Sequence, residues 1–136
     1  MLDAFPITIY HNPECGTSRN ALAMIAAAGY SPEVVLYRQA GWTRARLVEL
    51  LAAMEAKPRD ILREKGTPAA ELGLLDASVG DDAILDVMIE HPILVNRPIV
   101  VTPKGTRLCR PSELVLALVE TAPETFVKED GEIVRR

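Results

Sequence analysis

The stretch that decides the fold runs from Ile7 to Leu22 and reads ITIYHNPECGTSRNAL. In its first four residues two isoleucines alternate with a threonine and a tyrosine, as in a short β-strand. The Asn12-Pro13 pair is typical of a turn, and apolar residues then recur at helical spacing before Gly29. The stretch therefore predicts a strand, a loop and a helix, with Cys15 where the loop enters the helix.

Cys15 is predicted to be an activated thiol. The first amides of an α-helix lack intrahelical partners and lie at the positive end of its dipole, so they stabilise a thiolate or a bound oxyanion. Such a position, or a nearby imidazolium, lowers the pKa of a cysteine from about 8.5 to between about 3.5 and 7.5. His11 is a candidate for that imidazolium. The alternative, a small buried structural cysteine, is disfavoured by the polar, glycine and proline neighbours.

Ser18 stands where a Cys-x-x-Cys redox motif carries its second cysteine. Its hydroxyl is able to hydrogen-bond a thiolate but cannot form a disulfide. The other cysteine of the chain, Cys109, lies far away in sequence and is interpreted as a strand residue. Any disulfide step must therefore use a thiol from another molecule.

The composition is that of a globular protein with a single domain over residues 1–136. Of its residues, 49% are hydrophobic and 25% are charged, which is ordinary for such a domain. The net charge of −4 disfavours a nucleic-acid surface, and neither a signal peptide nor a membrane span is recognisable. The cysteines and histidines lack metal-ligand spacing. We therefore expect a cytoplasmic protein without nucleic-acid partner, membrane partner or bound metal.

The middle of the chain is predicted to be helical. A second strand over residues 33–37 follows the first helix, which predicts a parallel pair with a right-handed crossover. Three helical segments come next and are expected to begin at Thr43, at Pro58 and at Asp81 or Asp82, the last ending at His91. They form a helical insertion over about residues 43–91. From spacing alone, Arg63 lies on a solvated helix face.

The last third of the chain predicts a hairpin and a helix. Pro98 opens an apolar run, Lys104-Gly105 supplies a turn, and residues 106–109 return as a second strand. Pro111 suits the first turn of a last helix, and the residues from Thr121 on are expected to form a peripheral tail over about 121–136. The order of elements is that of a thioredoxin-like α/β fold, a mixed four-stranded sheet flanked by helices. In that layout Arg97 lies within reach of the cysteine.

Two motifs at matching separation carry a family resemblance. The first is HNPECGTSRN over residues 11–20, and the second is NRPIVVTP over 96–103 followed by GTRLCRPSE over 105–113. Over about residues 7–119 the chain closely resembles the glutathione- and glutaredoxin-coupled arsenate reductases, the ArsC family. The resemblance implies an enzyme of arsenical resistance that reduces arsenate to arsenite, with a thioredoxin-like fold and no tightly bound cofactor.

The resemblance also implies the site residues. The nucleophile, the histidine that helps to lower its pKa and a serine that contacts the thiolate are Cys15, His11 and Ser18. The three arginines that hold the arsenic oxyanion are Arg63, Arg97 and Arg110. The proline that matches Pro98 is cis, and Cys109 matches a cysteine that the reaction does not need. For Arg63, the resemblance therefore implies oxyanion binding, whereas spacing alone predicts an exposed position on a helix.

The implied reaction uses arsenate as substrate, glutathione as co-substrate and glutaredoxin as partner. The Cys15 thiolate attacks arsenate while the arginines offset the charge on its oxygens, and a thiol-arsenate ester forms. Glutathione attacks this adduct, two electrons pass to arsenic, and glutaredoxin resolves the mixed disulfide. The need for an external thiol agrees with the independent inference from Ser18.

Three other functions are compatible with parts of the sequence. A low-molecular-weight tyrosine phosphatase needs an arginine six positions after the cysteine, where this chain has Ala21. A Spx-like transcription regulator commonly uses a Cys-x-x-Cys switch, which Ser18 breaks. A general glutathione-linked thiol oxidoreductase of the same family is the nearest alternative, and the arginine-rich motifs disfavour it.

Overall fold

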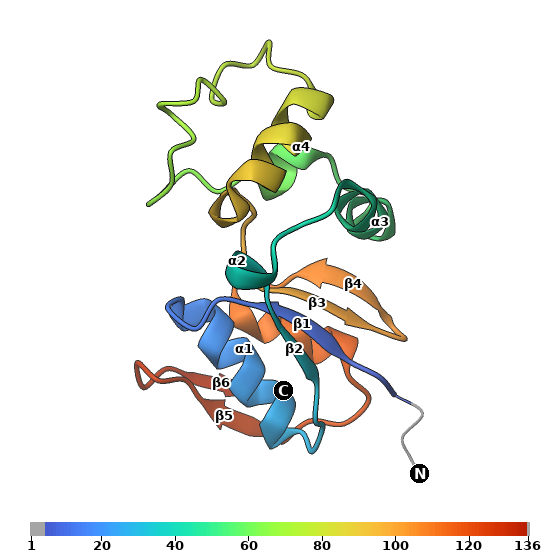
Figure 1. Ribbon diagram of the computed structural model, residues 1–136. Helices are drawn as coiled ribbons and strands as arrows, with labels where there is room; N and C mark the ends of the chain where they lie inside the picture. The colour runs from blue at the N-terminus through green and yellow to red at the C-terminus, as the bar shows by residue number, and fades with distance from the viewer. Residues whose placement is uncertain (1–4, 136) are drawn as a thin grey trace. The chain divides into compact units, whose positions relative to one another are not determined.

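The structure is a computed structural model that describes residues 5–135 and divides into two compact units (Figure 1). One unit extends to Leu36 and resumes at Arg97, and the other is Tyr37–Asn96. The second unit contains the helical insertion expected over about residues 43–91 and has wider bounds. The single domain over residues 1–136 stays a prediction.

The first unit is built on a mixed four-stranded sheet with the strand order β2-β1-β3-β4. Its strands are β1 Thr8–His11, β2 Glu33–Leu36, β3 Ile99–Thr102 and β4 Gly105–Leu108. Strand β1 pairs in parallel with β2 and antiparallel with β3, and β3 and β4 form an antiparallel hairpin. The predicted mixed sheet is confirmed, except that Cys109 follows the end of β4 instead of lying in it.

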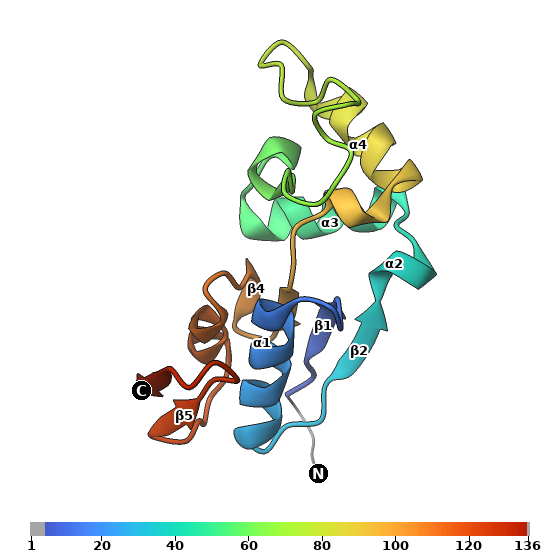
Figure 2. The ribbon, with the colours of Figure 1, turned by 90° about the vertical axis from the view of Figure 1, so that its left-hand side faces the viewer.

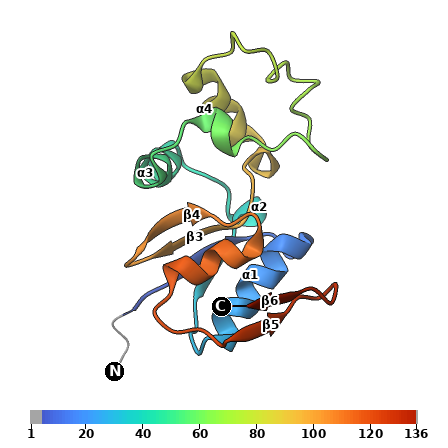
Figure 3. The ribbon, with the colours of Figure 1, turned by 180° about the vertical axis from the view of Figure 1, so that it is seen from behind.

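Two helices, α1 Gly16–Ala27 and the 3₁₀ helix η3 Ser112–Leu118, pack on one face of this sheet (Figures 1 and 3). The fully buried residues at this contact are Ile9, Met24, Ile25, Val100 and Val115. Burying an aliphatic side chain of this size contributes about 1.5–3 kcal/mol, so this cluster fixes α1 on the sheet. Pro111 is the residue that caps η3, one position before the first turn in which it was expected.

The C-terminal residues, for which a peripheral tail is expected over about 121–136, contain a β-hairpin that the sequence did not predict. Strands β5 Thr125–Val127 and β6 Ile133–Arg135 pair in an antiparallel hairpin beside α1 (Figure 2). Val134 of this hairpin belongs to the buried cluster of the first unit. Each strand has only three residues, which is too short for apolar alternation to be recognised in the sequence.

The second unit consists of short helices. They are α2 Tyr37–Ala40, α3 Arg44–Met54, η1 Pro58–Ile61, α4 Asp81–Glu90 and η2 Pro92–Leu94. Helix α3 begins as predicted, because the Thr43 hydroxyl accepts a hydrogen bond from the Arg46 amide at 3.1 Å. Helix α4 is capped by Gly80 instead of an aspartate, and Asp81 and Asp82 lie in its first turn, where the helix dipole favours negative charge.

Arg59 holds the irregular segment between Gly66 and Gly80 in place. Its guanidinium donates to the backbone carbonyls of Leu74, Asp76 and Val79 at 2.9, 3.0 and 3.0 Å. The buried side chains of the second unit include Leu47, Leu50, Ile61, Ile84 and Met88. The segment is therefore irregular, as predicted, and Arg59 connects three of its backbone carbonyls.

Candidate active site

Cys15 caps the N-terminus of α1. Its backbone is extended, with φ −102° and ψ 121°, and its carbonyl accepts the Arg19 amide at 2.9 Å. The preceding loop is closed by hydrogen bonds from the Cys15 amide to the Asn12 carbonyl, at 3.0 Å, and from the Glu14 amide to Asn12 Oδ1, at 2.9 Å. This turn brings Cys15 to the beginning of the helix, where the sequence places it.

The Cys15 thiol is acidic for a cysteine. Burial raises its pKa, but hydrogen bonding from the Ser18 amide and from the guanidiniums of Arg97 and Arg110 outweighs burial and lowers the pKa to about 7. Arg110 Nη1 lies 3.6 Å from the sulfur. A thiol with this pKa is about half ionised at neutral pH, so a thiolate is available for attack.

Arg97 and Arg110 stand at the two ends of the β3–β4 hairpin. Arg110 Nη1 donates to the Arg97 carbonyl at 2.9 Å, which ties the two ends together. The Arg97–Pro98 and Arg110–Pro111 peptide bonds are both cis, and the first of these is the bond that the resemblance implies. Two guanidiniums beside a thiolate create a positive environment that suits an oxyanion.

His11 and Ser18 form a buried hydrogen-bonded pair, with Nδ1 and Oγ 2.6 Å apart. Burial and then the charge of Arg19 lower the pKa of His11, so its imidazole is neutral at neutral pH. The Ser18 hydroxyl also accepts the Asn12 amide at 3.1 Å. Ser18 thus acts on Cys15 through its backbone amide, whereas the sequence suggests its hydroxyl. His11 contacts Ser18, whereas the sequence suggests an imidazolium acting on the thiol.

Arg63 belongs to the second unit. Its amide donates to the Leu94 carbonyl at 2.8 Å, and its guanidinium donates to Asn96 Oδ1 at 3.3 Å and to the Lys65 carbonyl at 3.2 Å. Asn96 directly precedes Arg97 in the chain. The role of Arg63 at the oxyanion stays a prediction.

Cys109 has the opposite properties to Cys15. Its side chain is fully buried, and burial raises its pKa to about 12. Its amide donates to the Pro98 carbonyl at 2.8 Å. A thiol with this pKa stays protonated at neutral pH, so Cys109 serves packing and not nucleophilic attack.

Arg19 is a residue of this site to which the sequence interpretation assigns no role. Its Nη1 donates to the Pro13 carbonyl at 2.7 Å, so it spans the loop that carries Cys15. A cation four residues after Cys15 lies on the same side of the helix, and this spacing is the signal that points to it.

The described part of the chain, residues 5–135, contains no group of three or more His, Cys, Asp or Glu residues placed to hold a metal ion. Nor does any helix in it have both the length and the apolar character needed to cross a membrane.

Known proteins resemble this chain over nearly its whole length. The model of the ArsC family matches residues 10–118. An arsenate reductase of Synechocystis sp. is 59% identical over 129 residues, covering 94% of this chain and 92% of that protein. An arsenate reductase of Escherichia coli is 53% identical over 129 residues, with the same two coverages, 94% and 92%. A solved arsenate reductase from Vibrio cholerae matches with a TM-score of 0.81 at 36% identity, covering 86% of this chain and 100% of that one. The fold is the predicted thioredoxin-like fold.

Proposed function

The chain belongs to the ArsC family, and from this premise we propose that it is an arsenate reductase, which converts arsenate to arsenite. The names of its relatives in Synechocystis sp. and Escherichia coli support this substrate. The observation that carries the proposal is the acidic Cys15 thiol with Arg110 at 3.6 Å from its sulfur. A nucleophile next to cationic donors matches an electrophile that is itself an anion.

The first step joins Cys15 to arsenic. The thiolate and arsenate are both negatively charged and repel each other unless positive charge offsets the repulsion. Arg97 and Arg110 supply that charge, and their forked donors suit the oxygens of a tetrahedral oxyanion. The sulfur attacks arsenic, an arsenic–sulfur bond forms, and one oxygen takes up protons and leaves as water.

The second step brings electrons from outside the chain. Reduction of arsenate to arsenite requires two electrons, and Cys109 cannot supply a second thiolate because burial raises its pKa to about 12. We assign the two thiols to glutathione and glutaredoxin. Glutathione forms an arsenic–sulfur bond on the adduct, and a second oxygen leaves as water. The glutaredoxin thiolate then attacks the glutathione sulfur, a glutathione–glutaredoxin disulfide forms, and the electron pair of the broken arsenic–sulfur bond reduces arsenic by two electrons. Water cleaves the remaining bond between arsenic and Cys15, which releases arsenite and the Cys15 thiolate. Both donors belong to the reducing cytoplasm, which is the compartment we assign.

We assign the remaining site residues by their contacts. His11 and Ser18 hold the loop so that the Ser18 amide donates to Cys15. Arg63 is the third arginine of the oxyanion site, an assignment that comes from the family motif. Replacing it (Arg63→Gln) should raise the KM for arsenate and leave the alkylation of Cys15 unchanged. If the KM stays the same, Arg63 does not bind the oxyanion.

The test is a coupled assay of purified protein. Arsenate, glutathione, glutaredoxin, glutathione reductase and NADPH are combined, and NADPH oxidation is followed at 340 nm, the absorbance maximum of NADPH. We expect a rate that rises with arsenate and is lost in Cys15→Ser, and phosphate in place of arsenate should give no rate. A rate that does not depend on arsenate but appears with a glutathione mixed disulfide would instead indicate a general glutathione-linked oxidoreductase.

A further inference from the structure

We propose that Arg19 and Glu129 form a clamp by which the C-terminal hairpin positions the loop that carries Cys15. Arg19 Nε and Nη2 donate to the two carboxylate oxygens of Glu129 at 3.1 and 2.7 Å. Its third nitrogen, Nη1, donates to the Pro13 carbonyl at 2.7 Å. The clamp therefore connects the hairpin to the loop. The inference rests on the proposed function only in that Cys15 is the nucleophile.

The chemistry of the guanidinium explains why one side chain is able to do this. Its donors are fixed in one plane, so two of them held by a carboxylate determine where the third one points. In Arg19 the third donor points at the Pro13 carbonyl, two residues before Cys15. The Glu129 amide also donates to Asn20 Oδ1 on α1 at 3.1 Å, which holds the backbone of Glu129 against the helix.

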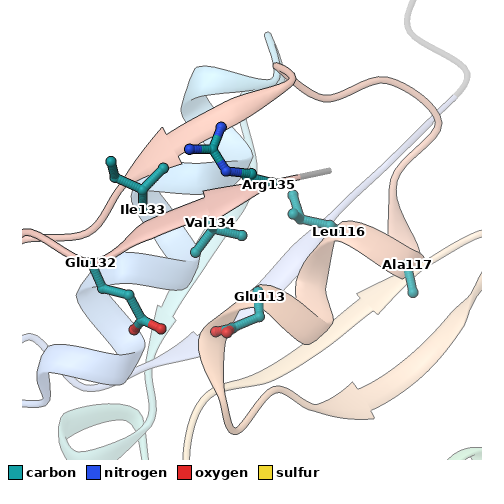
Figure 4. A pocket seen from close by; sticks show the side chains of 7 residues that line it. All are labelled: Glu113, Leu116, Ala117, Glu132, Ile133, Val134 and Arg135. Atoms are coloured by element: carbon teal, nitrogen blue, oxygen red, sulfur yellow. The ribbon is translucent and has the colours of Figure 1, made fainter.

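The hairpin provides a firm support for Glu129. Lys128 Nζ forms an ion pair with Glu113 at 2.8 Å, and this pair is the one that connects the hairpin to η3. The second ion pair of Lys128, with the exposed Glu132 at 2.9 Å, stays within the hairpin. Figure 4 shows these two glutamates on either side of a pocket of about 480 Å³ between η3 and the hairpin. Val134 anchors the second strand in the buried cluster. The turn that carries Glu129 is thus held from two sides.

The clamp lies close to the first residue of α1, which is a glycine. A Cβ atom at Gly16 would lie 3.1 Å from Glu129 Oε1 and 3.6 Å from Arg19 Nη2. The first of these distances is shorter than an ordinary van der Waals contact, so an alanine would press on the carboxylate and shift it slightly. The hairpin turn lies at this end of α1 in two views (Figures 1 and 3).

The clamp acts locally and not on the stability of the whole protein. The Arg19 and Glu129 side chains are 45% and 46% exposed, and an ion pair this exposed contributes little to global stability. Its loss would have two opposite effects on Cys15. A looser loop would weaken the hydrogen bonds to the thiolate and raise its pKa, whereas an Arg19 charge released from Glu129 would lower it. A rise in the pKa of Cys15 would therefore indicate that the clamp positions the loop, and a fall would indicate that Glu129 only screens the charge of Arg19.

The experiment compares the pH dependence of Cys15 alkylation by iodoacetamide in the wild-type protein, Glu129→Gln and Arg19→Lys. Arg19→Lys keeps the positive charge but loses the planar guanidinium that bonds Glu129 and the Pro13 carbonyl at the same time. We expect the pKa of Cys15 to rise by about one unit in both variants, which reduces the ionised fraction at pH 7 from about half to about one tenth. The melting temperature should stay unchanged. Arsenate is absent from this assay, so its outcome does not depend on whether the protein reduces arsenate.

The matched control is Glu132→Gln, which removes a carboxylate of the same hairpin that makes no contact with Arg19 and leaves the Lys128–Glu113 ion pair in place. It should keep the wild-type pKa. A second check is Gly16→Ala, which should raise the pKa in the wild-type background and have no further effect in Glu129→Gln. An unchanged or lowered pKa in Glu129→Gln, or an equal rise in Glu132→Gln, would overturn the clamp.

Discussion

Replacing Arg110 with glutamine (Arg110→Gln) is expected to raise the pKa of Cys15 from about 7 to about 8. Arg110 Nη1 lies 3.6 Å from the sulfur and also donates to the Arg97 carbonyl at 2.9 Å. A hydrogen bond to a charged group contributes about 1.5–3 kcal/mol, and the long distance to sulfur places this one at the lower end. A loss of about 1.4 kcal/mol corresponds to one pKa unit.

This shift has opposite effects on alkylation in neutral and in alkaline solution. At pH 7 the thiolate fraction falls from about half to about one tenth. A more basic thiolate is also more nucleophilic, by about threefold for each pKa unit at a Brønsted coefficient of 0.4–0.5. The rate at pH 7 should therefore fall about twofold, and the rate at pH 10 should rise about threefold, so that the two pH profiles cross.

The assay measures the second-order rate of iodoacetamide labelling at Cys15 between pH 5 and 10, with the labelled residue identified by mass spectrometry. The matched control is Arg107→Gln, which removes an equal charge from an exposed position on the same hairpin. It should leave the profile of Cys15 unchanged. If Arg110→Gln also leaves the profile unchanged, or if both variants shift it equally, the direct contact with sulfur is not what lowers the pKa.

Further predictions follow from the same contacts. Cys109→Ala should retain turnover that Cys15→Ser loses, because burial keeps the Cys109 thiol protonated; equal losses in the coupled assay would contradict this. His11→Ala should raise the pKa of Cys15 in the alkylation profile, since Ser18 loses its 2.6 Å partner, and an unchanged profile would remove His11 from the mechanism. The kcat/KM for arsenate should increase with pH through about 7, because the thiolate forms above its pKa; a flat profile would refute thiolate attack. Thr43→Ala should lower the free energy of unfolding in urea by about 1 kcal/mol, the usual effect of losing a helix cap, and a smaller loss would mean that the cap does not stabilise α3.

The elements that the sequence predicts well are those whose signal is local. Strand β1, helix α1 and the β3–β4 hairpin follow from alternation, helical spacing and turn residues within a few positions of one another. The C-terminal hairpin was missed because strands of three residues carry too little pattern. Its Asp130-Gly131 pair is a hairpin signal in itself, and Gly131 does adopt a positive φ of 94°.

In the active site, too, the sequence predicts the features that depend on neighbouring residues and not those that depend on distant contacts. The position of Cys15 at a helix N-terminus follows from the sequence, because the turn and the helix are adjacent to it. The pairing of His11 with Ser18 does not, since it depends on how the loop folds back over seven positions. Arg63 is assigned from the family motif alone. The helix that was expected to carry it, η1, ends at Ile61, so the helix face predicted for Arg63 is wrong and helical spacing could not show what its side chain binds. The sequence does not point to Glu129, because this residue lies in the turn of the C-terminal hairpin, whose strands are too short to be predicted.

The contact between Cys15 and Arg110 joins residues that are 95 positions apart in the chain, and this distance has a consequence for biosynthesis. The cysteine leaves the ribosome many seconds before the arginines that acidify it, since translation adds about 5–20 residues per second. Until the last third of the chain has been made and has folded, Cys15 lacks the two guanidiniums that help to lower its pKa. The unfinished polypeptide is thus less reactive toward oxyanions and disulfides than the completed protein.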